Sequence, residues 1–251
     1  MNPPDAYCFT RDFAPSGPAP FRVGRHYLLY ARSGTLRLEA EGLRWTLPPA
    51  RAALIAADHP ITIAILTQLT TASVLFAPDF MPAPRQAVTV FDLSPLARAL
   101  IGECLAFGPD DEPTAYGLTL FRTLCAVVLK LAETPSPFVL PVPSSVQLQR
   151  ALDLTEAQAA EDPTFAGIAR DTGQSPRALA RRFADEMGMT WQQALRRIRL
   201  MQAVERLATT PLPVTDIAMS VGYNSLSAFN AGFRELVGMS PTQYRATFQS
   251  S

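Results

Sequence analysis

The feature that most constrains the fold of this chain is a helical pattern that occurs twice in its C-terminal part. The first copy begins at Ser175 and the second at Ser225, 50 residues later (225 − 175). In both copies an apolar residue follows four positions after the serine, a phenylalanine follows eight positions after it, and Gly-Met closes the segment. A repeat of this length is a supersecondary unit, so we expect the same structure to form twice.

Each copy predicts a helix, a tight turn and a second helix. Ser175 and Ser225 are the expected N-caps, because a serine hydroxyl accepts a hydrogen bond from an unpaired N–H at a helix start. Gly188 and Gly238 are expected where each second helix ends, because the residue there commonly adopts a positive φ. Upstream of each copy an Ile-Ala pair and a glycine recur, which places a shorter helix and its turn before each second helix.

The outer faces of the two second helices carry residue types that suit a DNA major groove. On a helix with ~100° per residue, the apolar stripe faces one way and small, polar and arginine side chains face the other. Arginine bonds guanine and asparagine bonds adenine. The predicted base contacts are Arg177, Ala180, Arg181, Ser227, Asn230 and Ala231. The predicted phosphate contacts are Ser175, Arg170, Arg196, Arg197, Asn224, Ser225 and Arg234. The alternative is a pair of ordinary helical hairpins with solvated faces.

The charge of the chain is zero overall but is unevenly distributed. The 22 lysines and arginines balance the 22 acidic residues. From Phe165 to Arg206, however, eight arginines stand against four acidic residues, a local charge of +4 (8 − 4). Neutralisation of DNA phosphates is local, so this clustering matters more than the total. We therefore expect double-stranded DNA as a partner.

Roughly the last hundred residues resemble the DNA-binding domain of the AraC/XylS family of bacterial transcription regulators. The resemblance rests on Ile168-Ala169, Ser175–Phe183, Gly188-Met189, Arg196–Leu200, Val214–Ala218, Val221–Tyr223, Ser227–Phe229, Phe233-Arg234 and Gly238–Tyr244. It implies seven helices, with two helix-turn-helix units joined by a long central helix, and RNA polymerase as a further partner. Many family members have arginine where this chain has Ala231, so we expect the second unit to contribute orientation and affinity more than specificity.

The N-terminal part has a different pattern, with short alternating runs separated by turn residues. Residues 1–25 are rich in proline and glycine and are expected to form an irregular arm. Six strands are predicted over residues 27–30, 35–40, 43–47, 52–56, 61–66 and 72–76. Strands of this length with tight turns favour a small β-barrel or a jelly-roll-like sandwich. The turns and the Pro-Pro pair resemble a cupin barrel, the sensory domain of one branch of the same family.

A sensory barrel implies a small-molecule effector, whose identity the sequence does not give. The candidate effector-binding residues are Arg25, His26, Trp45, Arg51 and His59, with an ordinary salt bridge as the alternative for the charged ones. Cupin enzymes hold a metal through several histidines, but this chain has two. Strand alternation also directs Glu39 and Glu41 away from Leu36 and Leu38, so no metal or other cofactor is expected.

Two amphipathic helices are predicted after the strands, at residues 94–107 and 116–133, joined by the acidic turn 108–113. They either pack onto the barrel or form a homodimer interface, as in relatives of this layout.

Closely spaced prolines over residues 134–143 predict a stiff linker. The central helix is predicted at Trp191–Leu207, a length of ~25 Å, so the recognition helices would lie one DNA turn apart, ~34 Å.

The predicted fold class is α+β multidomain, with an N-terminal cupin-like β-barrel and helical hairpin and a C-terminal all-α twin helix-turn-helix domain. The predicted boundaries are 1–92 for the barrel, 93–134 for the hairpin, 135–144 for the linker and 145–251 for the DNA-binding domain. We expect a cytoplasmic transcription regulator that is not an enzyme and does not enter a membrane, since no long apolar run is present. The alternatives are a cupin-type metalloenzyme and a DNA-binding protein without a ligand. Whether transcription rises or falls is not predicted.

Overall fold

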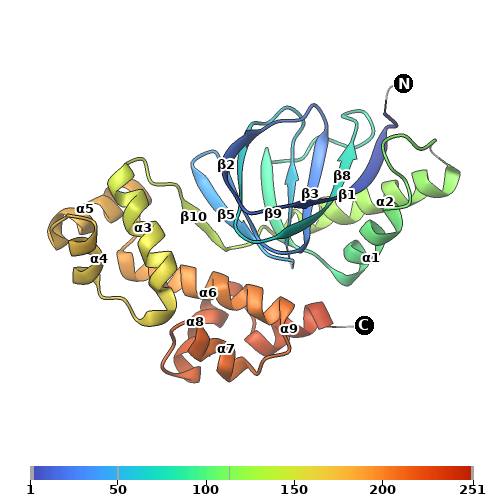
Figure 1. The fold of residues 1–251 in the computed structure, drawn as a ribbon. Coiled ribbons are helices and arrows are strands. Elements are labelled where there is room, and N and C mark those ends of the chain that lie inside the picture. Colours follow the sequence, from blue (N-terminus) through green and yellow to red (C-terminus); the bar gives the residue numbers. More distant parts are fainter. Residues whose placement is uncertain (1–2, 50, 113, 250–251) are drawn as a thin grey trace. The chain divides into compact units, whose positions relative to one another are not determined.

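The computed structural model describes residues 3–49, 51–112 and 114–249. These divide into two compact units, one made of residues up to Ala40 together with Trp45–Ser136, the other of Glu41–Arg44 and Pro137–Gln249. The first unit is built mainly from strands and the second from helices (Figure 1). This confirms the α+β multidomain class. Pro113 of the predicted acidic turn and the last two residues of the predicted DNA-binding domain lie outside the described residues.

The strands form two five-stranded sheets. The first has the order β1-β8-β3-β6-β9 and the second β10-β5-β4-β7-β2, with β10 and the tip of the β4–β5 hairpin counted in the C-terminal unit. The strands are β1 (Ala6–Phe13), β2 (Ser16–Phe21), β3 (His26–Ser33), β4 (Leu36–Ala40), β5 (Leu43–Leu47), β6 (Arg51–Ile55), β7 (Ile61–Ile65), β8 (Leu69–Phe76), β9 (Val88–Asp92) and β10 (Val139–Pro141). The six predicted strands correspond to β3–β8 and are confirmed. The sheets do not close into the predicted barrel.

Both faces of the first sheet are covered. In β3, every residue from His26 to Ala31 is buried, which requires cover on both sides because successive side chains point to opposite faces. On one side, apolar residues of β3, β6 and β8 share a core with the two helices that follow the strands. In β4, Leu36 and Leu38 are fully buried, as the alternation predicts.

The prediction of an irregular arm over residues 1–25 is wrong. Strand β1 pairs with β8 along its whole length, from Ala6 opposite Phe76 to Phe13 opposite Leu69. Strand β2 pairs with β7 at the edge of the second sheet, where a proline that lacks an N–H removes no bond to a further strand. All of its residues are exposed, so no alternation marked it as a strand.

Two helices, α1 (Pro95–Cys104) and α2 (Ala115–Leu131), follow β9 and confirm the predicted helical hairpin. Ser94 and Thr114 cap them by accepting hydrogen bonds from Ala97 N and Gly117 N. The hairpin packs on the first sheet through residues such as Phe121, whose ring contacts Phe76 edge to face. The three cysteines are free and buried, and burial raises the pKa of Cys8 and Cys104 to about 12, so these thiols stay protonated.

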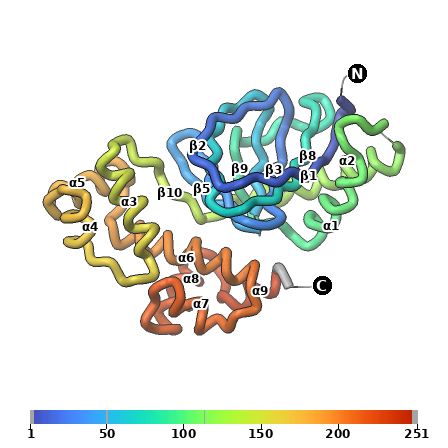
Figure 2. Tube along the Cα trace, viewed as in Figure 1, coloured from blue at the N-terminus to red at the C-terminus, as the bar shows by residue number. Residues whose placement is uncertain are grey.

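The C-terminal unit contains the seven α-helices that the family resemblance implies, counted over the described residues (Figure 2). They are α3 (Val146–Gln158), α4 (Phe165–Asp171), α5 (Pro176–Met187), α6 (Trp191–Thr209), α7 (Val214–Ser220), α8 (Leu226–Val237) and α9 (Pro241–Gln249), with a short 3₁₀ turn at Ala159–Glu161. One core joins all of them, with α6 contributing nine of its buried residues. Residues 137–141 precede α3, and Phe138 and Leu140 belong to this same core.

The helix ends agree with the sequence at most positions. Ser175, Ser225 and Thr190 are N-caps, and Gly188 and Gly238 adopt φ values of +63° and +80°. Helix α7 begins at Val214, directly after Pro213, whose fixed φ allows the chain to enter the helix there. Within the described part of the chain, no helix is both long enough and apolar enough to cross a membrane.

Candidate DNA-binding surface

Helices α5 and α8 occupy equivalent places in the two repeats. Each follows a shorter helix, α4 or α7, after a turn that contains a glycine with positive φ. Leu179 and Phe183 of α5 and Phe229 and Phe233 of α8 are fully buried. These pairs have i, i+4 spacing, so each helix is fixed by one stripe and its opposite face is turned outward.

The outward face of α5 carries two arginines whose side chains bond to none of the described residues. Arg177, Ala180 and Arg181 are all exposed. Among the residues that the structure describes, neither guanidinium has a hydrogen bond or an ion pair. Their donors are therefore available to a ligand, and a guanidinium presents them in a planar fork that matches guanine or phosphate.

The outward face of α8 is smaller and less charged. Ser227 and Ala231 are exposed and Asn230 is half-buried. Arg234, one turn after Asn230, is exposed and makes no side-chain bond to any described residue. Asn224 and Ser225 lie at the start of this helix, where the Ser225 hydroxyl accepts a hydrogen bond from Ala228 N at 3.4 Å. The surface can therefore meet another molecule closely, because its side chains are short.

Helix α6 connects the two helix pairs: α4 and α5 precede its start, and α7 and α8 pack along it (Figure 1). At its start, the ring of Trp191 packs on Phe165 of α4 at 5.4 Å, and the indole N–H donates to the buried Thr155 hydroxyl at 2.9 Å. At its end, Arg206 bonds Ser220 of α7. With 19 residues it spans about 28 Å, so the two pairs are held apart at a fixed distance.

The turn between α7 and α8 packs directly on α6. Gly222 has φ +90°, and a Cβ there would lie 2.5 Å from the carbonyl oxygen of Ala159 and 2.8 Å from the guanidinium of Arg199. Arg199 donates to that same Ala159 oxygen at 2.8 Å and pairs with Asp162 at 3.2 Å. Only glycine fits this close approach, so the second turn is fixed to the middle of the unit. The matching Gly173 of the first pair has open space around it.

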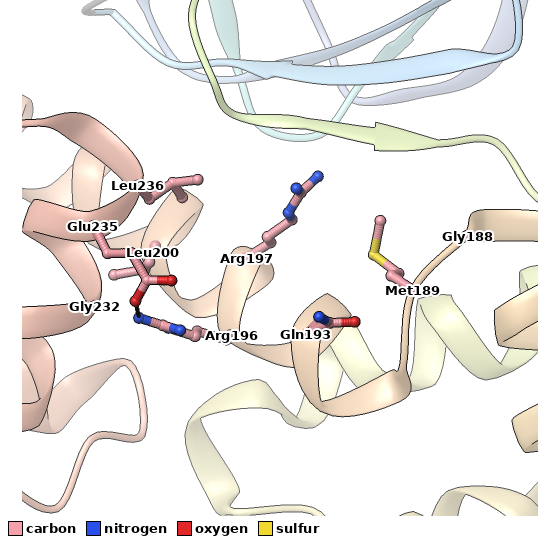
Figure 3. Close-up of a pocket in the computed structure, with 9 residues that line it drawn as sticks. All are labelled: Gly188, Met189, Gln193, Arg196, Arg197, Leu200, Gly232, Glu235 and Leu236. Carbon is pink, nitrogen blue, oxygen red and sulfur yellow. Dashed lines mark hydrogen bonds and ion pairs between the residues drawn. The ribbon is translucent and has the colours of Figure 1, made fainter.

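A pocket of about 260 Å³ lies between α6 and α8 (Figure 3). Arg196 crosses it to form an ion pair with Glu235, and Arg196 also interacts with the hydroxyl of Tyr223. Gly232 of α8 permits this arrangement, since a Cβ there would lie 3.1 Å from Arg196 Nε. The guanidinium that the sequence predicts as a phosphate contact is thus paired with an acidic residue of the second helix pair.

Arg197 has a different orientation. Figure 3 shows its side chain extending away from Glu235, and its Nη1 donates to the carbonyl oxygen of Val139 at 3.2 Å. Of the other predicted phosphate contacts, Arg170 pairs with its neighbour Asp171 at 3.0 Å, and the Ser175 hydroxyl caps α5. Arg196 and Arg197 thus join elements of the unit, whereas Arg177 and Arg181 face outward with no partner among the described residues.

Two helix-turn-helix pairs on a common connecting helix, each with a capped second helix and a solvated outer face, define a DNA-binding domain of the twin helix-turn-helix class. Residues 168–247 match the family described as helix-turn-helix domain, so this part of the chain is a helix-turn-helix domain of the AraC type.

The most similar proteins include two regulators. Over 98 residues the chain is 37% identical to the ornithine utilization regulator of Pseudomonas aeruginosa, covering 39% of this chain and 29% of that protein. Over 71 residues it is 38% identical to the transcriptional activator RhaR of an Enterobacter species, covering 28% of this chain and 25% of RhaR. The solved structure of ToxT from Vibrio cholerae aligns over 98% of this chain and 100% of that chain, at 11% identity and a TM-score of 0.43.

The chain thus spans less than a third of the length of the curated relatives it matches. The similarity to those two relatives is confined to 98 and 71 residues of the chain. It therefore identifies a domain, while the activity of the whole protein is a matter for proposal.

The predicted effector residues are engaged in contacts that support the N-terminal unit. Arg25 donates to the carbonyl oxygens of Pro3, Pro4 and Asp5 and lies over the ring of Tyr7. Arg51 is 1% exposed and pairs with Asp92 at 3.0 Å, which is the salt bridge that the sequence left open as the alternative.

The two histidines both bond to the segment that follows β6, and the tryptophan lies in β5. Nδ1 of the buried His26 accepts a hydrogen bond from Ala57 N at 3.1 Å, and burial lowers the pKa of His26. The backbone N–H of His59 donates to Ala56 O, and Trp45 is buried in β5. Within residues 3–49, 51–112 and 114–249, no three His, Cys, Asp or Glu side chains gather as metal ligands would.

Proposed function

We propose that the chain is a transcription regulator whose C-terminal unit binds promoter DNA through two recognition helices and whose N-terminal unit senses a small molecule. The observation that carries the proposal is the pair of outward arginines on α5, Arg177 and Arg181, which have no partner among the described residues while Arg196, Arg197 and Arg199 are bonded internally. An exposed guanidinium that has no such partner can bind a base edge or a phosphate without first breaking a bond within the protein, so the free-energy cost of that contact is small.

We assign the DNA contacts as follows. Base edges are read by Arg177, Ala180 and Arg181 of α5 and by Ser227, Asn230 and Ala231 of α8. Phosphates are bound by Ser175, Arg170, Asn224, Ser225 and Arg234. For Arg196 and Arg197, phosphate contact stays a prediction, and it requires each to exchange a partner that it holds within the protein.

The first prediction concerns Arg181. Replacement by alanine removes a base contact and should weaken binding to the specific duplex by about 1–3 kcal/mol, with a smaller effect on random duplexes. Arg150→Ala is the matched control, because Arg150 is an exposed arginine on α3, outside both helix-turn-helix pairs. Titrations on specific and random DNA at two salt concentrations measure both losses. If Arg181→Ala and Arg150→Ala weaken binding equally, α5 does not read sequence.

The helical hairpin is proposed to hold a second copy of the chain. Leu96 at the start of α1 and Tyr116 at the start of α2 are 56% and 60% exposed, so each helix of the hairpin leaves a large apolar side chain uncovered. A homodimer would bring two DNA-binding units onto adjacent half-sites. RNA polymerase is the further partner that promoter binding implies. We expect the regulator, the promoter DNA and RNA polymerase to meet in the cytoplasm.

Sedimentation of the full chain tests this second prediction. The wild type is expected to sediment as a dimer at micromolar concentration, and Leu96→Glu with Tyr116→Glu is expected to shift it to a monomer. Thr119→Glu with Arg122→Glu adds the same number of acidic groups to exposed positions of α2 and serves as the control. If the wild type remains monomeric at high concentration, the dimer proposal is wrong, and the DNA-binding proposal is unaffected.

A further inference from the structure

A second cavity, of about 400 Å³, lies within the N-terminal unit and contains none of the five effector residues that the sequence predicts. Its base is a cross-strand pair, Leu54 of β6 directly opposite Thr89 of β9. One wall is the end of α2 and the other is the segment 82–86 that precedes β9. A volume of this size is typical of small-molecule sites, which commonly lie within about 300–1,000 Å³.

The walls of this cavity are stiff. Pro82, Pro84 and Pro135 all line it, and a proline ring fixes φ, so these segments lose little conformational freedom when a ligand binds. The apolar part of the lining includes Leu129 on α2 and Ala132 just after it, above the fully buried Leu54 of the core. A ligand can therefore place an apolar group against a surface that is already formed.

A buried hydroxyl at the base of the cavity is poorly satisfied. Thr89 is 4% exposed, and its Oγ1 donates to Gln86 Oε1 at 3.5 Å, well beyond the usual 2.5–3.0 Å for an O–H···O bond. Gln86 itself is exposed on the wall formed by residues 82–86. A ligand that brings a polar group between these two side chains would complete the bonding of both.

Opposite charges lie on the two walls. Arg85 is exposed on the 82–86 segment, and Glu133 stands at the end of α2, where its Oε2 pairs with Lys130 at 2.7 Å. The hydrogen bond from Lys130 lowers the pKa of Glu133, and the charge of Arg85 lowers it further, so Arg85 lies within electrostatic range of this carboxylate. A ligand with one charge alone could pair with only one of the two walls.

We propose that this cavity binds a small zwitterion of the amino-acid type. Its carboxylate pairs with Arg85 and its ammonium group with the Oε1 of Glu133, while its apolar side chain lies against Leu129 and Ala132. Arginine suits a carboxylate because its planar donors bond both oxygens at once. The inference specifies the ligand class for the sensing role proposed above and rests on that role.

Calorimetric titration of the full chain with the twenty standard L-amino acids tests the inference. At least one is expected to bind. For the tightest, two matched probes are then used, each lacking one charge; for L-leucine these are 4-methylpentanoate and 3-methylbutylamine. Both are expected to bind at least tenfold more weakly than the amino acid. If the probe that lacks the ammonium group binds as tightly as the amino acid, the ligand is not a zwitterion. If no amino acid binds at all, the proposed site is wrong.

Two variants test whether the ligand binds in this cavity. Arg85→Gln and Glu133→Gln are each expected to weaken amino-acid binding tenfold or more, whereas Arg122→Gln, an exposed α2 residue outside the cavity lining, should leave it unchanged. Unchanged binding in Arg85→Gln would place any bound amino acid elsewhere. Specific DNA binding is measured on the same samples. If the wild type binds specific DNA but no amino acid, only this inference is rejected, while an absence of specific DNA binding in the wild type rejects the proposed function.

Discussion

Glu186, near the end of α5, ties this helix to the start of α3. Its carboxylate accepts from the backbone N–H of Ser145 at 2.8 Å, from the hydroxyls of Ser145 and Ser144 at 2.7 and 2.9 Å, and from Arg182 at 3.4 Å. The side chain is only 13% exposed. Burial acts to raise the pKa of Glu186, but these hydrogen bonds outweigh it and the pKa is lowered.

The lowered pKa gives a third prediction with a defined pH dependence. Because the folded-state pKa lies below the ordinary value of about 4.3, Glu186 stabilises the fold above that value, and this stability is lost as the pH falls through the folded pKa. Glu186→Gln, which resembles the protonated acid, should lower the free energy of unfolding by about 1–2 kcal/mol at pH 7. The difference from wild type should shrink below about pH 4.

Fluorescence of Trp191 during denaturation measures this effect in the C-terminal unit, in a Trp45→Phe background because the sequence has two tryptophans. Asp185→Asn is the control, since Asp185 is an exposed neighbour on the same helix. A destabilisation by Glu186→Gln that stays constant between pH 7 and pH 3.5 would show that the carboxylate charge is not responsible.

Single residues were predictable from the sequence where the cause is local. The caps Ser175 and Ser225 act within one turn of their own helices, and the positive φ of Gly188 and Gly238 follows from the end of a helix. The partners of Glu186 and Arg196 were not predictable, because they lie about 40 residues away along the chain and local spacing carries no signal for them. The sequence shows that Arg196 is charged but not which carboxylate it meets.

At the scale of elements, the ion pair between Arg196 and Glu235 decides how α8 is held against α6. It crosses the pocket in Figure 3, and Tyr223 and the missing side chain of Gly232 complete its surroundings. An exposed ion pair contributes little stability on average, so its main effect would be on the orientation of the second recognition helix. A phosphate contact by Arg196 would compete with this pairing.

A fourth prediction separates the two roles of Arg196. If it positions α8, both Arg196→Ala and Glu235→Gln should weaken specific DNA binding by about tenfold, or 1.4 kcal/mol, with little change in salt dependence. If it binds phosphate, Arg196→Ala should lower the salt slope by about one, and Glu235→Gln should leave binding unchanged or strengthen it, because a negative charge is removed. Titrations of both variants across a salt series decide between them, with Arg150→Ala as the matched control.

Elements were predictable where burial on one side imposes a period on the sequence. Strands β3, β6 and β8 are buried on both faces and are recognised as short apolar runs instead, while β4 and helices α1, α2 and α6 carry that period. Strand β2 does not, because it is exposed on both faces and its strand conformation depends on pairing with β7. Strand β1 does alternate at its start, yet the surrounding prolines and glycines outweighed this signal in the sequence.

At the scale of the whole molecule, the chain consists of two units with separate cores, joined near Ser136 and Pro137. The predicted linker at 135–144 is not a simple spacer, since Phe138 and Leu140 are buried in the C-terminal core and Val139–Pro141 form β10. The prolines around this segment predicted its lack of helix but gave no indication that it packs. Separate cores allow one unit to bind a small molecule and the other to bind DNA.

The central claim is that two recognition helices, held apart by α6, read two segments of one duplex. Selection of bound duplexes from a random pool by the full chain tests it most directly. We predict enrichment of two short sequence segments centred about one helical turn apart, roughly 10 base pairs, with the segment facing α5 the more strongly defined. Arg181→Ala should erase that segment and leave the other. A pool that shows no enrichment, or one segment alone, would contradict the account.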